Sequence, residues 1–184
     1  MIDLWFPSCV YRIDKLDNNN IKNQITVLEK HNEFVRTEFN EVDSSYDIKD
    51  VHNNSEFQSL FNKINYHIDQ FRKELGYTKK IIIDHSWFNI SFKGDYVSQH
   101  IHPGSIISGA YYLECNSVND KIFFHKNNDM TLPPDNLNPL NFKSCEYECT
   151  VDRLLLFKSN LPHSTSKQKG KRKIVLSFNT KFDD

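Results

Sequence analysis

The segment Gly94-Asp95-Tyr96-Val97-Ser98-Gln99-His100-Ile101-His102-Pro103 constrains how this chain can fold. On a strand, His100 and His102 project to the same side, because side chains alternate across a sheet with a period of two. A third histidine, His163, follows far downstream and can meet this pair only if the chain doubles back. Histidines that converge inside a β-barrel are typical of metal sites with open positions for substrate and oxygen. The sequence therefore indicates a metal-dependent enzyme.

Length and charge narrow the class of protein. The chain has 184 residues and a net charge of −1, which fits one domain with a full hydrophobic core. Lys and Arg are spread along the sequence, so we expect no nucleic-acid partner and no basic membrane anchor. No apolar run approaches the roughly 20 residues that span a bilayer, and the N-terminus does not resemble a signal peptide. We therefore expect a cytoplasmic protein.

The four cysteines carry no functional signal. They are Cys9, Cys115, Cys145 and Cys149, and they show neither zinc-ribbon spacing nor a Cys-x-x-Cys pair. We interpret them as reduced thiols, because a disulfide framework belongs to secreted proteins.

The first part of the chain predicts a helical cover. Apolar residues follow helical spacing from Ile21 to about Phe39, and more clearly from Ser55 to Leu75. Ser55 is the expected N-cap of the second helix and Gly76 its C-cap. The segment from Val42 to Asn54 is polar and is expected to form a loop.

From Lys80 onward, short segments rich in β-branched and aromatic residues alternate with turn residues. Helices followed by strands favour a mainly β fold, a double-stranded β-helix of jelly-roll type with N-terminal helices packed on one outer face. We expect a single domain over 1–184, with the helical cover at 1–79 and the β core at 80–184. A loop without regular structure is expected at 127–141. The expected strands span 80–84, 86–92, 96–102, 107–114, 120–125, 146–151, 153–158, 162–165 and 172–181.

One of these strands has two distinct faces. Between Trp87 and Phe92, Asn89 and Ser91 lie on one face, and three apolar residues lie on the other. A barrel with a site inside it needs its polar face inward and its apolar face outward, against the helices. The apolar residues are Phe88, Ile90 and Phe92.

The residues from Trp87 to Lys181 resemble the double-stranded β-helix of the 2-oxoglutarate- and Fe(II)-dependent oxygenase superfamily. The likeness is closest to a small hydroxylase family whose strand reads His-x-His-Pro-x-Ser, followed by Ser-Gly-x-Tyr-Tyr. This chain has His100-Ile101-His102-Pro103-Gly104-Ser105 and then Ser108-Gly109-Ala110-Tyr111-Tyr112. Downstream, Leu156-Phe157-Lys158-Ser159-Asn160-Leu161-Pro162-His163 resembles the family's second metal segment, and Arg172-Lys173-Ile174-Val175-Leu176-Ser177-Phe178-Asn179 resembles its last strand.

The resemblance implies a function and a set of site residues. It implies an enzyme that uses Fe(II), 2-oxoglutarate and O2 to hydroxylate a substrate that the sequence does not identify. His100 and His163 would bind the iron. Arg172 would pair with the distal carboxylate of 2-oxoglutarate, to which a guanidinium can donate two parallel hydrogen bonds. Tyr112 and Asn89 match positions that contact the same cosubstrate in related enzymes.

Two of these assignments have a simpler alternative. Arg172 can instead be a solvated charge in the basic run from Lys167 to Lys173. Tyr112 can instead be an aromatic residue that only packs on its strand.

His102 departs from the superfamily pattern, which has aspartate or glutamate two residues after the first histidine. Either His102 coordinates and the site is a neutral three-histidine face, or it stands off and two histidines suffice. We expect coordination, because alternation with His100 and the following Pro103 direct its ring to the same inward side.

Two other kinds of protein remain open at this point. A cupin-type metalloenzyme that does not use 2-oxoglutarate shares the fold, but Ile106 and Ile107 stand where its glutamate is expected. The second cupin motif also fails, because Lys158 and Asn160 replace its proline and glycine. A catalytically inactive jelly-roll binding module is the other alternative, since fold alone does not determine function. The sequence does not indicate an oligomeric state.

Overall fold

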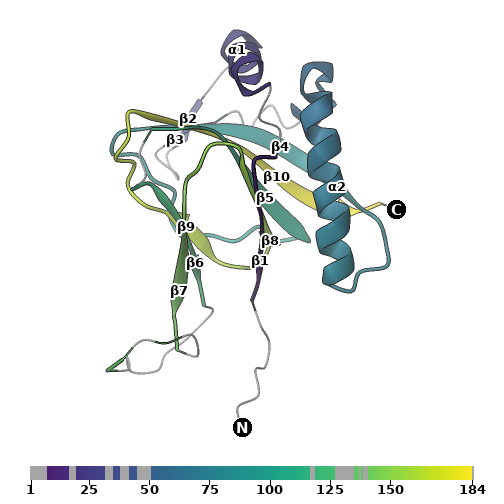
Figure 1. Cartoon of the computed structure of the whole chain (residues 1–184), viewed down its shortest axis with the longest axis vertical. Helices are drawn as coiled ribbons and strands as arrows, with labels where there is room; N and C mark the ends of the chain where they lie inside the picture. The colour runs from purple at the N-terminus through teal and green to yellow at the C-terminus, as the bar shows by residue number, and fades with distance from the viewer. Residues whose placement is uncertain are drawn as a thin grey trace.

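Two antiparallel β-sheets form the framework of the computed structural model (Figure 1). The structure describes residues 8–16, 20–31, 35–37, 42–44, 51–116, 119–126, 135–136, 138 and 141–183. The larger sheet has the strand order β1-β8-β5-β10-β4-β3-β2, and the smaller sheet has the order β7-β6-β9. The strands are β1 (Val10–Asp14), β2 (Val35–Thr37), β3 (Val42–Ser44), β4 (Ile81–Phe92), β5 (Ile107–Cys115), β6 (Lys121–His125), β7 (Ser144–Glu148), β8 (Arg153–Lys158), β9 (His163–Thr165) and β10 (Arg172–Phe182).

The helices pack on the outer face of the larger sheet. They are α1 (Ile21–His31) and α2 (Gln58–Glu74), with 3-10 turns at Val51–Asn53 and Ser55–Phe57. α2 runs alongside the sheet in Figure 1. Helical spacing places its apolar residues on one stripe, and the same core includes Leu28 of α1 and Phe88 and Ile90 of β4. The buried residues of α2 are Leu60, Phe61, Ile64, Ile68 and Phe71.

The inner face of the larger sheet is turned toward the smaller sheet. Asn89 and Ser91 of β4 line a cavity of about 380 Å³ between the two sheets, together with Ile122 of β6. The predicted inward face of this strand is therefore confirmed, whereas Phe92 on the outward face is 43% exposed and lies outside the core. The predicted mainly β, double-stranded β-helix fold is also confirmed.

Most strands predicted after Lys80 are present, with two differences. The segments 80–84 and 86–92 form one continuous strand, β4. The predicted strand at 96–102 is irregular, and only His100 forms a β-bridge, with His163. Its other backbone groups form isolated hydrogen bonds instead of a ladder; for example, His102 N–H donates to Ser159 O at 2.9 Å. The predicted loop at 127–141 lies largely outside the described residues.

The first third of the chain contributes strands as well as helices, which corrects the expected helical cover. The first helix ends at His31 instead of continuing to Phe39, and β2 and β3 follow it. β1 pairs with β8, and β3 pairs with β4. Such short strands depend on partners that are distant in sequence, so they leave no periodic signal of their own.

The ends of the second helical segment follow helix-capping chemistry. The side chain of Asn54 accepts a hydrogen bond from the backbone N–H of Glu56, so the expected cap, Ser55, lies inside the 3-10 turn. The C-cap of α2 is Leu75 instead of the predicted Gly76, which follows it with a φ of 80°, a value that glycine adopts without strain.

Two further features concern the cysteines and the length of the helices. All four cysteines are free thiols. Within the described ranges, no helix is long and apolar enough to cross a membrane.

Candidate metal centre

Three histidines converge at one edge of the cavity. His100 and His163 face each other across the β-bridge, with both backbone N–H···O distances at 3.0 Å. This pairing places their ring centroids 4.2 Å apart, and the His102 ring lies 4.9 Å from His100 and 5.1 Å from His163. One nitrogen from each ring lies within 4.8 Å of the other two. Segments that are far apart in the sequence thus meet in one cluster of imidazoles.

Backbone carbonyls orient two of these rings. Nδ1 of His100 lies 2.8 Å from the carbonyl oxygen of Ser98, and Nδ1 of His163 lies 2.9 Å from that of Leu161. A carbonyl oxygen can only accept, so each Nδ1 carries the proton and donates. The Nε2 atom of each ring therefore has a free lone pair, which is the tautomer that a metal-binding histidine needs.

The third ring, His102, has different neighbours. Its Nε2 lies 3.3 Å from Nε2 of His163, and its Nδ1 lies 3.4 Å from the side-chain nitrogen of Asn179. Two nitrogens bound to one ion at about 2.1 Å lie roughly 3.0–3.4 Å apart, for angles between octahedral and tetrahedral. The Nε2 separation of His102 and His163 falls in this range.

Two rings of the cluster, His102 and His163, are neutral at physiological pH. Burial, followed by the proximity of His100, lowers the pKa of His163 to about 3 and that of His102 to about 4. Neutral imidazoles keep their lone pairs available for coordination. A set of three imidazole nitrogens suits a divalent transition-metal ion such as Fe(II). The residues present therefore fit a metal of this class.

The cavity beside the histidines is mostly apolar. Trp87, Ile122, Phe157 and Val175 contribute to its walls. Lys173 also lines it and is only 3% exposed. Among the residues that the structure describes, it is the one lysine or arginine that lines the cavity, and no aspartate or glutamate lines it.

Two predicted cosubstrate residues, Asn89 and Tyr112, line the same cavity. The amide nitrogen of Asn89 donates to the hydroxyl of Ser177 at 3.0 Å. Burial, followed by the nearby Cys149 thiol, raises the pKa of the Tyr112 phenol well above its usual value. The phenol therefore stays protonated, and a side-chain hydrogen bond joins it to Cys149.

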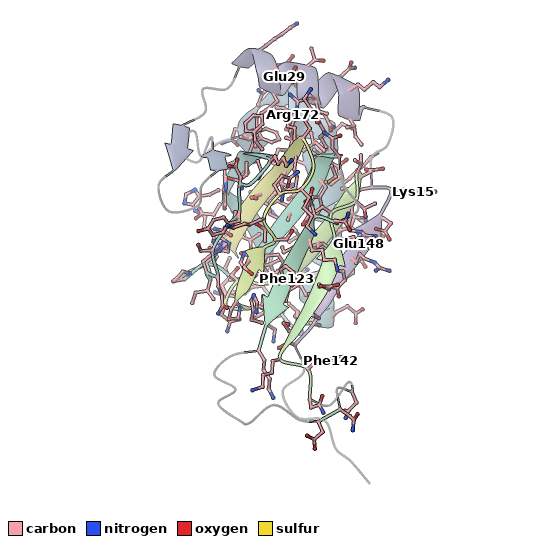
Figure 2. The ribbon with its side chains drawn as sticks, turned by 90° about the vertical axis from the view of Figure 1, so that its left-hand side faces the viewer. Lys15, Glu29, Phe123, Phe142, Glu148 and Arg172 are labelled. Atoms are coloured by element: carbon pink, nitrogen blue, oxygen red, sulfur yellow. The ribbon has the colours of Figure 1, made fainter. Side chains whose placement is uncertain are left out.

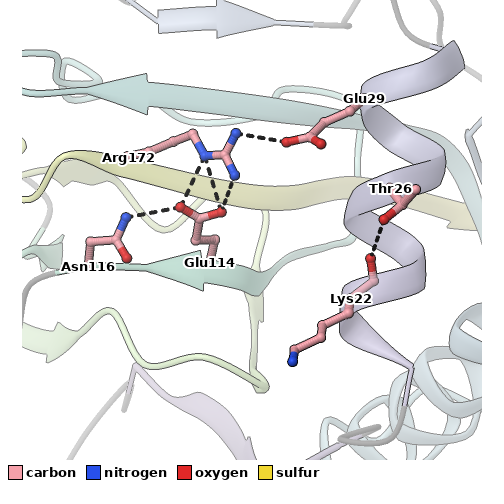
Figure 3. Close-up of polar contacts among 6 residues, drawn as sticks. All are labelled: Lys22, Thr26, Glu29, Glu114, Asn116 and Arg172. Carbon is pink, nitrogen blue, oxygen red and sulfur yellow. Dashed lines mark hydrogen bonds and ion pairs between the residues drawn. The ribbon is translucent and has the colours of Figure 1, made fainter.

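The structure does not bring Arg172 to this cavity. Its guanidinium binds both carboxylate oxygens of Glu114, with Nε at 3.0 and 3.1 Å and a terminal nitrogen at 2.6 Å (Figure 3). It also donates to Glu29 of α1 at 2.8 Å. Figure 2 shows Arg172 and Glu29 together at the α1 end of the molecule. Arg172 thus joins α1 to the sheet instead of facing the histidines.

The physical reason is the alternation of side chains along β10. Lys173, Val175 and Ser177 line the cavity, so Arg172 points to the opposite face. The sequence alone does not determine which residues of this strand face the cavity, because a register shift of one residue exchanges the two faces. The apolar residues Ile174 and Leu176 at alternate positions were the signal that could have identified Lys173 as inward-facing.

A protein-family model described as "Putative 2OG-Fe(II) oxygenase" matches residues 85–179 of this chain. No curated protein matches it. The fold is similar to that of a Pseudomonas putida prolyl-4-hydroxylase, with a TM-score of 0.70, 9% sequence identity and coverage of 96% of this chain and 94% of that one.

Two further solved structures share the fold. A prolyl hydroxylase from Trichoplax adhaerens, in complex with a hypoxia-inducible-factor peptide, has a TM-score of 0.68 and 15% identity, covering 92% of this chain and 82% of that one. HygX from Streptomyces hygroscopicus, with nickel, 2-oxoglutarate and hygromycin B bound, has a TM-score of 0.66 and 10% identity, covering 94% and 82% respectively.

Proposed function

Because the chain belongs to the 2OG-Fe(II) oxygenase family, it is an enzyme that uses Fe(II), 2-oxoglutarate and O2, and we propose that His100, His102 and His163 hold its iron. The observation that carries this proposal is the convergence of the three imidazoles beside a buried cavity. Family membership also decides against the cupin and the inactive binding module that the sequence left open.

The proposed partner of the distal 2-oxoglutarate carboxylate is Lys173. A buried ammonium without a counter-charge is costly, and an anionic guest in the cavity would remove that cost. The ammonium lies on the cavity wall, whereas Arg172 is already paired with Glu114 and Glu29. Tyr112 and Asn89 are proposed to donate further hydrogen bonds to the same cosubstrate, since both side chains line the cavity.

When bound, Fe(II) and 2-oxoglutarate supply the activation of O2 that hydroxylation of a substrate C–H bond requires. The chain supplies fixed ligands, a cation that orients the cosubstrate, and apolar walls that exclude water. Trp87, Phe157 and Val175 form part of these walls. We propose that the prime substrate enters this same cavity and reacts beside the histidines.

The proposal extends to the organisation and location of the protein. We propose that residues 1–184 act as a single oxygenase domain, because β1 and β3 from the first part of the chain pair with β8 and β4 of the core. We propose a cytoplasmic location, which the free thiols support because reducing compartments preserve them.

Turnover of 2-oxoglutarate tests the proposed function. Reconstituted with Fe(II) under air, the wild-type protein should convert 2-oxoglutarate to succinate, and one member of a substrate library should accelerate this conversion. The His100→Ala and His163→Ala variants should lose the activity, while folding as the wild type does by circular dichroism. Succinate formation that persists in both variants would overturn the assignment of these residues.

A further inference from the structure

The cavity has two ends of different character, which the register of β4 and β10 sets apart. Ser91 and Lys173 are paired at one end, and Trp87 and Ser177 are paired further along the same two strands. At about 3.3 Å per residue, the two pairs are separated by roughly 13 Å. Paired residues of antiparallel strands share one face of the sheet, and both pairs line the cavity. The cavity therefore has a lysine end (Ser91 and Lys173) and a tryptophan end (Trp87 and Ser177).

The histidine cluster lies at the tryptophan end. The ring centroid of Trp87 is 6.1 Å from that of His102, and the ring centroid of Phe157 is 4.7 Å from that of His163. Both aromatic side chains line the cavity beside the imidazoles. A group that reaches these histidines through the cavity therefore lies against aromatic surface.

Small side chains stand beside the large ring at this end. Ser177 of β10 is paired with Trp87 on β4 and with Ala110 on β5. Across three neighbouring strands, this level of the sheet thus carries one indole and two small side chains, and all three residues line the cavity. The small side chains leave the space that a guest beside the indole needs.

The charges around the cavity limit what can enter it together with the cosubstrate. Within the described ranges, Lys173 is its one lysine or arginine, and its walls contain no aspartate or glutamate. The proposed function assigns this ammonium to 2-oxoglutarate. A second ionised group in the cavity would lose its hydration without meeting a counter-charge, which is strongly unfavourable. An apolar group gains free energy when it leaves water for the same walls.

We propose that the prime substrate presents an uncharged, apolar group to the tryptophan end, and that Trp87 is the specificity-determining residue that contacts it. This inference rests on the proposed function, since it assigns Lys173 to the cosubstrate and the three histidines to the metal. It excludes substrates whose reaction requires an ammonium or a carboxylate to enter the cavity beside the histidines.

Three ring compounds of nearly the same size test this proposal: benzyl alcohol, benzylammonium and benzoate. Their binding to the protein loaded with Zn(II) and 2-oxoglutarate is measured by nuclear magnetic resonance of the ligands, with zinc as a diamagnetic substitute for Fe(II). Benzyl alcohol should bind at least about 10-fold more tightly than either ion, because only the ions lose hydration without a counter-charge. Equal or tighter binding of either ion, or no binding of benzyl alcohol, would overturn the proposal.

The same measurement without 2-oxoglutarate separates this proposal from the proposed function. Benzoate should then bind at Lys173, and added 2-oxoglutarate should displace it without displacing benzyl alcohol. If benzoate does not bind, or if 2-oxoglutarate does not displace it, the assignment of Lys173 to the cosubstrate fails. The preference for benzyl alcohol over the two ions in the loaded protein tests the substrate class.

Variants at the two ends of the cavity test the role of Trp87. Trp87→Ala should weaken the binding of benzyl alcohol about 10-fold, because it removes the aromatic surface on which the ring packs. Trp87→Phe keeps an aromatic wall and should retain most of the affinity. Ser91→Ala is the matched control, since it changes the lysine end only and should not alter the binding of benzyl alcohol. Unchanged binding in Trp87→Ala, or equal losses in Trp87→Ala and Ser91→Ala, would overturn the role assigned to Trp87.

Discussion

Arg172 and Lys173 are adjacent in sequence, yet their side chains lie on opposite faces of β10. Arg172 is held by Glu114 and Glu29 outside the cavity, and Lys173 is buried on the cavity wall. The two cations therefore have separate surroundings: Arg172 joins α1 to the sheet, and Lys173 is the residue that we propose binds the anionic cosubstrate.

This separation predicts unequal effects on 2-oxoglutarate binding. Lys173→Met should weaken binding about 30- to 1000-fold, because deleting one partner of a buried charge pair costs roughly 2–4 kcal/mol. Arg172→Met is the matched control. It should change the affinity for 2-oxoglutarate by less than about threefold, because the ion pairs of Arg172 with Glu114 and Glu29 lie outside the cavity and contribute only to stability. Anaerobic calorimetry with the metal-loaded protein measures both. A loss of affinity confined to Arg172→Met would assign the 2-oxoglutarate carboxylate to Arg172 instead of Lys173.

The Glu114–Arg172 pair predicts a pH-dependent stability. The hydrogen bond from Arg172 is the main cause that lowers the pKa of Glu114 below its usual value. The pair therefore stabilises the fold above the unfolded pKa of about 4.3 and loses this contribution as pH falls through the lowered folded value. Glu114→Gln should cost about 1 kcal/mol at pH 7, discounted for partial exposure, and almost nothing in strong acid. Urea unfolding of the wild type and of Glu114→Gln, at pH 7 and in strong acid, measures the loss of stability at each pH. An equal loss at both would contradict the prediction.

The close approach of Gly109 to the Phe178 ring leaves no room for a side chain at this position. A Cβ atom at this position would lie 2.1–2.7 Å from three ring atoms of Phe178, which is fully buried. Gly109→Ala should therefore destabilise the fold by about 1–3 kcal/mol through overpacking. Adding Phe178→Leu should recover part of this loss, because the smaller side chain makes room for the new methyl group. Strictly additive costs in urea unfolding would show that the two residues are not in contact.

Substitutions of His102 should change metal affinity in a way that depends on the new side chain. His102→Ala should lower metal affinity without unfolding the domain, because two histidines remain. His102→Asp should still bind metal, since it restores a face of two histidines and one carboxylate. Metal content and dissociation constants of the three proteins measure this. Wild-type affinity in His102→Ala would place His102 outside the metal's ligands.

Local patterns in the sequence were sufficient to predict much of the fold. The helical stripe of α2 and the alternation in β4 each arise from side chains that are close in sequence, so they can be interpreted without a structure. β1 and β3 could not be predicted in this way. Their stability comes from pairing with β8 and β4, and nothing in their own residues encodes those partners.

The candidate site shows the same limit. His100, His102 and His163 could be selected from motif spacing, and the structure brings them together. The residue that binds 2-oxoglutarate could not be chosen from the sequence in the same way. The choice between Arg172 and Lys173 depends on the register of β10.

Anaerobic absorption spectroscopy tests most directly the claim that these histidines hold the iron. Fe(II) and 2-oxoglutarate added to the wild type should give a weak visible charge-transfer band, because the keto acid chelates the protein-bound metal. His100→Ala and His163→Ala should each abolish the band. His125→Ala should retain it, because His125 bonds to Ser164 and is not part of the three-histidine cluster. A band at full strength in both His100→Ala and His163→Ala would contradict the account.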